Sequence, residues 1–371
     1  MKFKANHQRI AFVLLLVILS IGTVLRVYDL GNGGYNTDEV FSVHHASLAL
    51  KEIISNSENE PHPQLYYILL HFWMKTFGDS EIVTRLLSSL FGIISIFLMY
   101  RLGRLLFNKE TGIIASLIIA ISTFHITYSQ ESRMYSLMAM LTLASMFFFI
   151  KMMREKSIKI IVYYQLSSIL LLYSHIYGFF IILSQNLYLA IISLKFPKQN
   201  PYISLKKWIA VQSLLLLAFI PWIWIFIHQI IGINNGSFVN LNWLPSTHLS
   251  GLLYIFFVYA YYDPITLALF SLLSLSVLIT WKKYERNVRI QRSGTILFLF
   301  LWLLVPILVP FVISMLAFPI YYPKYTISSS LAFYMLISRG ISQINNKYLK
   351  GLALSAVIFL SSASIIYYLL Y

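Results

Sequence analysis

The sequence predicts an all-α polytopic membrane protein, and two observations carry that prediction. Hydrophobic residues make up 58% of the 371 residues and charged residues only 11%, whereas soluble domains carry roughly 25% charged residues. The apolar residues also come in long runs nearly free of charge, and a helix that crosses a bilayer needs roughly 17–25 such residues. Because every backbone N–H and C=O group in lipid must be paired within the protein, these runs are predicted to be helices.

The runs predict about eleven transmembrane spans. The first continues to Leu25 with no small-residue cleavage site after it, so we interpret it as an uncleaved span and not as a signal peptide. The predicted spans are residues 10–25, 84–103, 111–128, 134–150, 158–173, 176–194, 208–228, 264–281, 294–313, 326–338 and 351–370.

The charged residues sort to opposite sides of these spans. With the N-terminus inside, 22 of the 28 basic residues fall in cytoplasmic segments, as the positive-inside rule predicts. Ten of the 13 acidic residues and eight of the nine histidines fall outside. The rule explains the cations but not the acids and histidines. We therefore predict a cell-membrane protein whose chemistry lies on the extracytoplasmic side.

We expect a single membrane domain over residues 1–371 and no soluble domain. Its extracytoplasmic loops are predicted at about 26–85 and 229–264. The net charge of +15 does not indicate a nucleic-acid partner, because the basic residues form short clusters between apolar runs and not one stripe. Membrane lipids are the expected surroundings.

The first outer loop has the pattern of two short helices. Asp38–Leu50 is predicted to be a helix capped by Asn36 or Thr37, with acidic residues in its first turn. Leu65–Phe77 is an aromatic-rich stretch of about 13 residues, which is short for a span. It suits a helix lying in the membrane interface.

Two groups of charged residues are the main candidates for chemistry. Asp38 and Glu39 are adjacent carboxylates that suit a general base and its partner, although acids in a first helical turn also simply complement the helix dipole. Glu131 and Arg133 lie in a tight outer turn between two apolar runs. Ionisable residues at membrane depth usually mark function, although a local ion pair that staples the turn is the alternative.

For the other candidates, a purely structural role explains the residues at least as well as a functional one. His62 begins a rigid entry to the interfacial helix, and a turn with a capping histidine is the better interpretation from the residues alone. Lys324 and Arg85 each suit a phosphate or a side chain that reaches back to the interface. A divalent metal site that includes Glu39 and His62 is a weak option, to which at most one of His44 and His45 would contribute.

The sequence contains no P-loop and no G-x-G-x-x-G motif. Nucleotide-linked substrates are therefore not expected, and the substrates must arrive through the membrane or from outside. A transporter or lipid flippase is the rival class, but transporters often show repeated halves and no repeat is visible here. A non-catalytic scaffold would leave Asp38, Glu131 and Arg133 unexplained.

Several short motifs follow one another along the chain. They are Thr37-Asp38-Glu39, His62-Pro63-Gln64-Leu65-Tyr66-Tyr67, Phe77-Gly78-Asp79-Ser80-Glu81, Arg85-Leu86, Tyr128-Ser129-Gln130-Glu131-Ser132-Arg133-Met134-Tyr135 and Pro323-Lys324-Tyr325. Together they resemble the motifs of the polyprenyl-phosphate-sugar-dependent glycosyltransferases of the GT-C fold, and more narrowly those of the protein O-mannosyltransferase and aminoarabinose-transferase-like group, glycosyltransferase families 39 and 83. The resemblance is clear over about residues 10–200, and two departures from the family pattern are Gln64 in place of a second proline and Lys324 in place of arginine.

The resemblance implies a sugar donor on a polyprenyl phosphate, and an acceptor that is left open among protein, lipid and glycan. It implies inversion, with Asp38 as the general base, Glu39 as a secondary acid, and Glu131 orienting Arg133 or the acceptor. Cations would stabilise the departing lipid phosphate, and a divalent metal is not required. The implied phosphate-binding residues are Arg133, Arg85 and Lys324, and the implied substrate-pocket residues are His62, Tyr66, Gln130 and Tyr135.

Overall fold

The computed structural model describes residues 2–55, 62–195, 203–234, 247–285 and 291–370. Within these ranges all regular elements are helices, which confirms the all-α prediction. Parts of both predicted outer loops, residues 56–61 and 235–246, lie outside the described residues.

The helices follow the apolar runs of the sequence closely, and each of the eleven predicted spans coincides with a helix or with part of a bent pair. In chain order they are α1 (Lys2–Val27), α2 (Thr37–Ser47), α3 (Leu50–Ser55), α4 (Leu65–Phe77), α5 (Glu81–Leu106), α6 (Lys109–Ala120), α7 (Thr123–Ser129), α8 (Tyr135–Arg154), α9 (Ile158–Ser174), α10 (Gly178–Lys195), α11 (Leu205–Asn234), α12 (Ser250–Tyr259), α13 (Pro264–Glu285), α14 (Gln291–Leu316), a 3₁₀ turn (Pro323–Thr326), α15 (Ile327–Ser342) and α16 (Lys347–Leu370).

Six of the described helices are long and apolar enough to cross a membrane, and eight spans result if each of two bent pairs counts as one. This establishes an integral membrane protein, while the total of eleven spans remains a prediction. The three predicted spans beyond these eight are the shorter helices α9, α10 and α15. In α15 only Arg339 is not buried, so this helix packs against protein on all sides and does not need the length of a lipid-exposed span.

The two bent pairs were not predicted. Helices α6 and α7 meet at 60°, and α12 and α13 meet at 92°. The first break leaves the carbonyls at the end of α6 without helical partners. The buried guanidinium of Arg26 donates to the carbonyls of Ile119 at 2.9 Å and Ala120 at 3.0 Å, and so stabilises the break.

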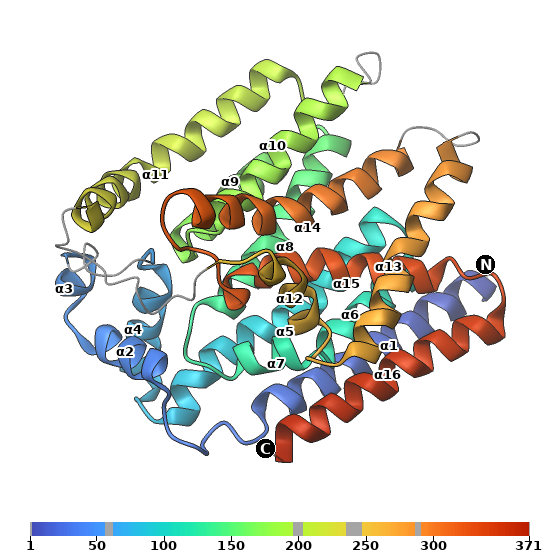
Figure 1. Cartoon of the computed structure of the whole chain (residues 1–371), viewed down its shortest axis with the longest axis horizontal. Helices are drawn as coiled ribbons and strands as arrows, with labels where there is room; N and C mark the ends of the chain where they lie inside the picture. The colour runs from blue at the N-terminus through green and yellow to red at the C-terminus, as the bar shows by residue number, and fades with distance from the viewer. Residues whose placement is uncertain (1, 56–61, 196–202, 235–246, 286–290, 371) are drawn as a thin grey trace.

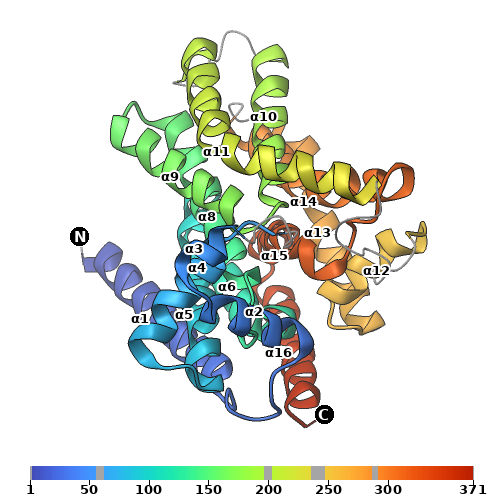
Figure 2. The same ribbon diagram turned by 90° about the vertical axis from the view of Figure 1, so that its left-hand side faces the viewer.

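The long helices run roughly along the long axis of the molecule, and α2, α3 and α4 gather at one end of it (Figure 1). Seen from that end, these three short helices lie in front of the bundle (Figure 2). Helix α5 packs against α1, α6 and α8, and it also contacts α4. The N-terminus lies at the end of the molecule far from α2 and α4 (Figure 1).

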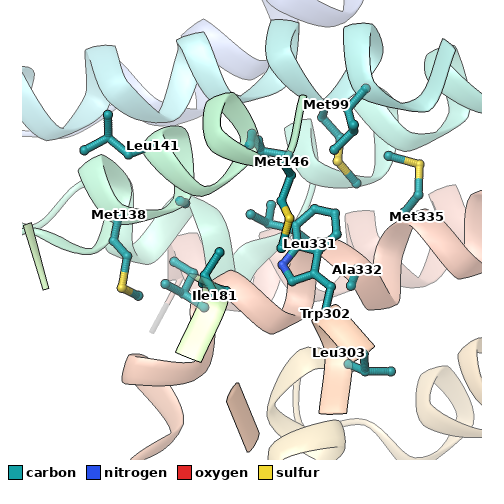
Figure 3. Close-up of a cluster of buried hydrophobic side chains, with 14 of the residues drawn as sticks. Met99, Met138, Leu141, Met146, Ile181, Trp302, Leu303, Leu331, Ala332 and Met335 are labelled. Carbon is teal, nitrogen blue, oxygen red and sulfur yellow. The ribbon is translucent and has the colours of Figure 1, made fainter. Parts of the chain in front are cut away.

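The core lies where α5, α8, α10, α14 and α15 meet. Trp302 of α14 is fully buried there, with Met146 and Leu331 beside it (Figure 3). Methionine side chains such as Met99 and Met335 fill the irregular gaps between the helices.

Small residues let α15 approach its neighbours closely. A Cβ atom added at Gly340 would lie 2.0 Å from the carbonyl oxygen of Leu273 on α13. No side chain fits at this position unless the backbone moves. Close helix packing in membranes commonly depends on glycine in this way.

We predict that Gly340→Ala destabilises the protein by about 1–3 kcal/mol, since overpacking against backbone carries that cost. Gly351→Ala is the matched control, because its Cβ would meet nothing within 4 Å and alanine is the better helix former. Thermal melting of the purified variants in detergent measures both. A Gly340→Ala protein that melts no lower than wild type would show that the α13–α15 contact is looser than described.

Candidate active site

Helix α2 begins near the end of α1, and its first turn holds the two predicted carboxylates. The Asn36 side chain accepts a hydrogen bond from the Glu39 N–H at 2.9 Å, and the Glu39 carboxylate accepts one from the Asn36 N–H at 3.1 Å. This capping box fixes the start of the helix and confirms Asn36 as its cap. Glu39 is buried, whereas the Asp38 side chain remains 43% exposed.

Glu39 forms a buried two-point ion pair with Arg85 on α5. Arg85 Nε lies 2.8 Å from Glu39 Oε1, and Arg85 Nη2 lies 2.9 Å from Oε2. The Ser132 N–H also donates to Oε1, at 2.9 Å. The carboxylate thus joins α2, α5 and the turn before α8, and these bonds leave it little capacity to serve as an acid, a base or a metal ligand.

The guanidinium of Arg85 is also occupied by bonds to protein groups. Its Nη1 donates to the carbonyl of Leu30 at 2.8 Å, and its Nη2 donates to the carbonyl of Gly34 at 2.5 Å. Gly33 and Gly34 adopt φ angles of 91° and 70°, which glycine allows at little cost. The guanidinium therefore holds the loop between α1 and α2, and its donors are occupied by protein groups where the resemblance implied a phosphate.

Arg133 ties the turn before α8 to helices α2 and α4. Its Nη1 lies 3.2 Å from the backbone oxygen of Asp38, 2.9 Å from the hydroxyl of Ser42 and 3.2 Å from that of Tyr67. The structure gives no ion pair between Arg133 and Glu131 among the described residues, so the alternative of a local staple finds no support. Arg133 instead places a buried positive charge beside Asp38.

Lys324 reaches Asp38 from the far end of the sequence. Its ammonium lies 2.5 Å from Asp38 Oδ2, 5.5 Å from the ring centre of Tyr135 and 5.3 Å from that of Tyr322. Burial alone would raise the pKa of Asp38, but the hydrogen bond from Lys324 and the charge of Arg133 outweigh burial. The pKa of Asp38 is therefore below its ordinary value, and its carboxylate is ionised at neutral pH.

Two histidines stack beside this cluster. The rings of His62 and His175 lie 4.5 Å apart, and Tyr325 contacts both, at 5.5 and 5.0 Å. Burial, followed by the charges of Arg133 and Lys324, lowers the pKa of His175 to about 3. Burial also lowers the pKa of His62, so both rings are neutral at physiological pH.

His175 was not among the predicted site residues. Its Nδ1 accepts a hydrogen bond from the Tyr177 N–H at 3.1 Å, so the proton of the neutral ring is on Nε2. That buried nitrogen has no partner among the described residues. The signal was present in the sequence, because His175 lies in a short turn between two predicted spans, as Glu131 does.

The predicted pocket residues have different surroundings. Tyr135 lies beneath the Lys324 ammonium and 6.1 Å from the His175 ring. Tyr66 is fully buried, and its hydroxyl bonds to Ser88 at 2.8 Å, which indicates a packing role. Gln130 donates to the carbonyl of Tyr28 at 2.8 Å and accepts from the hydroxyl of Tyr368 at 2.9 Å, so it ties the turn to α1 and α16.

A cavity of about 1090 Å³ opens next to this cluster, between residues 28–36, 123–131, 258–263 and 360–369. Glu131, Glu39 and Arg85 line it, and no described residue forms a hydrogen bond or ion pair with the Glu131 carboxylate. Burial raises the pKa of Glu131 to about 7, and the opposing charge of Lys324 offsets only part of that effect. A carboxyl group of this pKa exchanges protons readily near neutral pH.

Within the described residues, no three histidine, aspartate or glutamate side chains come together in a way that would hold a metal. Glu39 bonds to Arg85, and His62 stacks on His175. His45 bonds to Gln64 at 2.8 Å while His44 is exposed. The suggested metal site at Glu39 and His62 therefore has no donor set in this part of the chain.

Comparison with known proteins supports the family resemblance. A family model described as dolichyl-phosphate-mannose-protein mannosyltransferase matches residues 61–225. The chain has the GT-C fold. A crystal structure of ArnT from Cupriavidus metallidurans aligns with 92% of this chain at a TM-score of 0.61 and 13% identity, and a second, bound to undecaprenyl phosphate, aligns with 92% at 0.57 and 13%.

The oligosaccharyltransferase AglB from Archaeoglobus fulgidus, in complex with an inhibitory peptide and a dolichol-phosphate, aligns with 97% of this chain at a TM-score of 0.62 and 13% identity. The chain spans about three fifths of the length of these proteins, with 61% of ArnT and 56% of AglB covered. The sequence search against curated proteins gives no match.

We predict that Glu131→Gln stabilises the protein at high pH and not at low pH. Because the pKa of Glu131 rises from 4.5 to about 7 on folding, the folded state favours the protonated side chain, and that advantage is lost as pH rises through about 7. Glutamine stays neutral, so the variant should gain up to about 3 kcal/mol over wild type at pH 8 and nothing at pH 4.

Melting temperatures of both proteins between pH 4 and 8 measure the effect. Glu155→Gln is the control, since it makes the same change at a side chain that is 51% exposed. A difference between wild type and Glu131→Gln that does not change with pH would contradict the raised pKa of Glu131.

Proposed function

We propose that this protein transfers a sugar from a polyprenyl-phosphate donor to an acceptor hydroxyl on the extracytoplasmic face of the cell membrane, with inversion at the sugar carbon. The observation that carries the proposal is the contact between Asp38 and Lys324, at 2.5 Å, with Arg133 beside it. A proton acceptor and two cations meet at one end of a GT-C bundle. Such a pairing serves a reaction in which a hydroxyl loses a proton while a phosphate gains negative charge.

The cations supply the reason for a lipid-phosphate donor. Lys324 acts as a compact positive charge suited to a phosphate, and its ammonium lies over the rings of Tyr135 and Tyr322. The ArnT and AglB structures of the same fold were solved with undecaprenyl phosphate and dolichol-phosphate. A polyprenyl phosphate is the corresponding donor carrier for this chain.

The Asp38 carboxylate accepts the proton of the acceptor hydroxyl, and the acceptor oxygen forms a bond to the sugar carbon. The bond from that carbon to the phosphate oxygen breaks, and its electron pair leaves with the lipid phosphate. Lys324 and Arg133 stabilise the negative charge that develops on the phosphate.

Because of the Asp38–Lys324 contact, the donor should bind before Asp38 becomes an effective base. In the absence of donor, Lys324 lowers the pKa of Asp38, which makes the carboxylate a weak base. A donor phosphate competes with Asp38 for the ammonium. When Lys324 moves to the phosphate, Asp38 loses its strongest hydrogen bond, its pKa rises, and it becomes a better proton acceptor at the moment when the donor is in place.

The surrounding residues take supporting roles in this proposal. Glu131 faces the 1090 Å³ cavity, so we assign it to orient the acceptor hydroxyl. The Nε2–H of His175 is a buried donor that suits a sugar hydroxyl or a phosphate oxygen. Glu39 and Arg85 also line this cavity, but their charged groups are bonded to each other, so we assign them to position Asp38.

We predict that Asp38→Asn lowers sugar transfer by about 10²–10⁴-fold, because asparagine keeps the shape of the side chain but accepts no proton. The assay is transfer or hydrolysis by the purified protein of a labelled sugar supplied on polyprenyl phosphate, with a nucleotide sugar in parallel. The nucleotide sugar should give no product. Asp79→Asn, in the same outer loop and exposed, is the matched control and should retain activity.

Three outcomes would contradict the proposal. Wild-type turnover by Asp38→Asn would remove Asp38 as the base and direct the search to Glu131. Equal use of the nucleotide sugar would refute the donor class. Movement of the lipid donor across a vesicle membrane without cleavage of the sugar would favour the rival flippase function.

A further inference from the structure

A second cavity, of about 740 Å³, lies far from the candidate active site. It is next to the last turns of α5, whereas Arg85 of the active site is in the first turns of the same helix. The 16 residues between Arg85 and Arg101 correspond to about 24 Å of helix. The sorting of charged residues predicts that this end of the bundle faces the cytoplasm.

Four basic side chains from three helices line this cavity, which we call the basic groove: Arg101 and Arg104 of α5, Lys109 of α6 and Lys151 of α8. Aromatic rings form its walls. The Arg101 guanidinium lies 5.4 Å from the ring centre of Phe147, and the Lys151 ammonium lies 5.7 Å from that same ring. Two like charges are thus held around one buried ring.

Carboxylates do not balance these charges. None of the lining residues is acidic. Glu110 lies close in sequence but pairs with Lys350 at 2.8 Å, and Glu155 reaches Lys151 only at 3.6 Å from a side chain that is 51% exposed. The side chains of Arg104 and Lys109 form no hydrogen bond or ion pair with the described residues. The groove therefore has an excess of positive charge that an anion would neutralise.

The positive-inside rule accounts for basic residues at this end of the bundle, but not for their convergence on an apolar cavity. Phe12 and Leu15 of α1 form one wall. Phe12 is 62% exposed and belongs to an apolar surface on α1 that includes Val13 and Leu16, which are 56% and 47% exposed. A ligand that satisfies both parts of the groove needs a negative head and an apolar tail.

We propose that the basic groove binds the head group of an anionic phospholipid from the cytoplasmic leaflet. The phosphate lies among Arg101, Arg104, Lys109 and Lys151, and an acyl chain follows the exposed surface of α1 past Phe12. Basic pockets between transmembrane helices on the cytoplasmic side suit anionic head groups, and the neighbouring rings keep the cations in place. The site is independent of the proposed transfer reaction.

The test compares the full-length protein with a double variant, Arg104→Gln with Lys109→Gln. These two side chains have no described partner, so their removal should leave the fold intact. Lys206→Gln with Lys207→Gln is the control, because it removes the same charge from exposed positions outside the groove. Each protein is purified in neutral detergent and titrated with phosphatidylglycerol or phosphatidylcholine, and binding is followed by native mass spectrometry and by thermal melting.

Wild type and the control should bind phosphatidylglycerol in preference to phosphatidylcholine and melt at a higher temperature with it. The groove variant should bind phosphatidylglycerol about tenfold or more weakly, since each basic residue near an anionic head group contributes several-fold to binding. Equal binding by the groove variant would overturn the proposal, and so would an equal loss in the control. Stabilisation of wild type by soluble glycerol phosphate at matched concentration would also overturn it, because the ligand would then be a free phosphate.

Discussion

The end of the molecule that holds α2, α3 and α4 depends on one buried ion pair, Glu39 with Arg85. Removal of one partner of a buried pair is costly, roughly 3–5 kcal/mol, because the other charge is left without compensation. The same two side chains also bond to the loop before α2 and to the turn before α8. Arg85 donates to the carbonyl of Gly34, and Glu39 accepts from the N–H of Ser132. Asp38 precedes Glu39 in the same helical turn. The Glu39–Arg85 ion pair therefore also sets the position of Asp38 relative to Lys324, although Asp38 is not part of that pair.

The sequence was sufficient for the elements whose signal is local. The apolar stretch Leu65–Phe77 became α4 with the same bounds, and Asn36 is the cap of α2. Elements that depend on packing between distant parts of the chain could not be predicted from the sequence. Helix α12 falls in a stretch interpreted as an outer loop, and the break between α6 and α7 needs Arg26, more than 90 residues away, to satisfy its carbonyls. Spacing along the chain does not reveal such partners.

The candidate site shows the same difference between what local sequence predicts and what only the fold reveals. Residue types and chain position were enough to select Asp38, Glu131, Arg133 and Lys324, which the fold brings to one end of the bundle. They were not enough to assign roles, because Lys324 reaches Asp38 across 286 residues and Glu39 reaches Arg85 across 46. The ion pair between Glu39 and Arg85 leads us to propose them as supporting residues, the pKa of Glu131 is raised, and His175 is a further candidate.

We propose that Glu39 and Arg85 hold the site together and do not react with substrate. The test is a double-mutant cycle of Glu39→Gln, Arg85→Gln and the pair together, with the free energy of unfolding measured in detergent. Each single variant should lose on the order of 3–5 kcal/mol, and the double variant should lose clearly less than the sum, because neither charge is then left alone. A Glu39→Gln protein that is as stable as wild type but has lost sugar transfer would contradict the claim, because Glu39 would then be part of the chemistry.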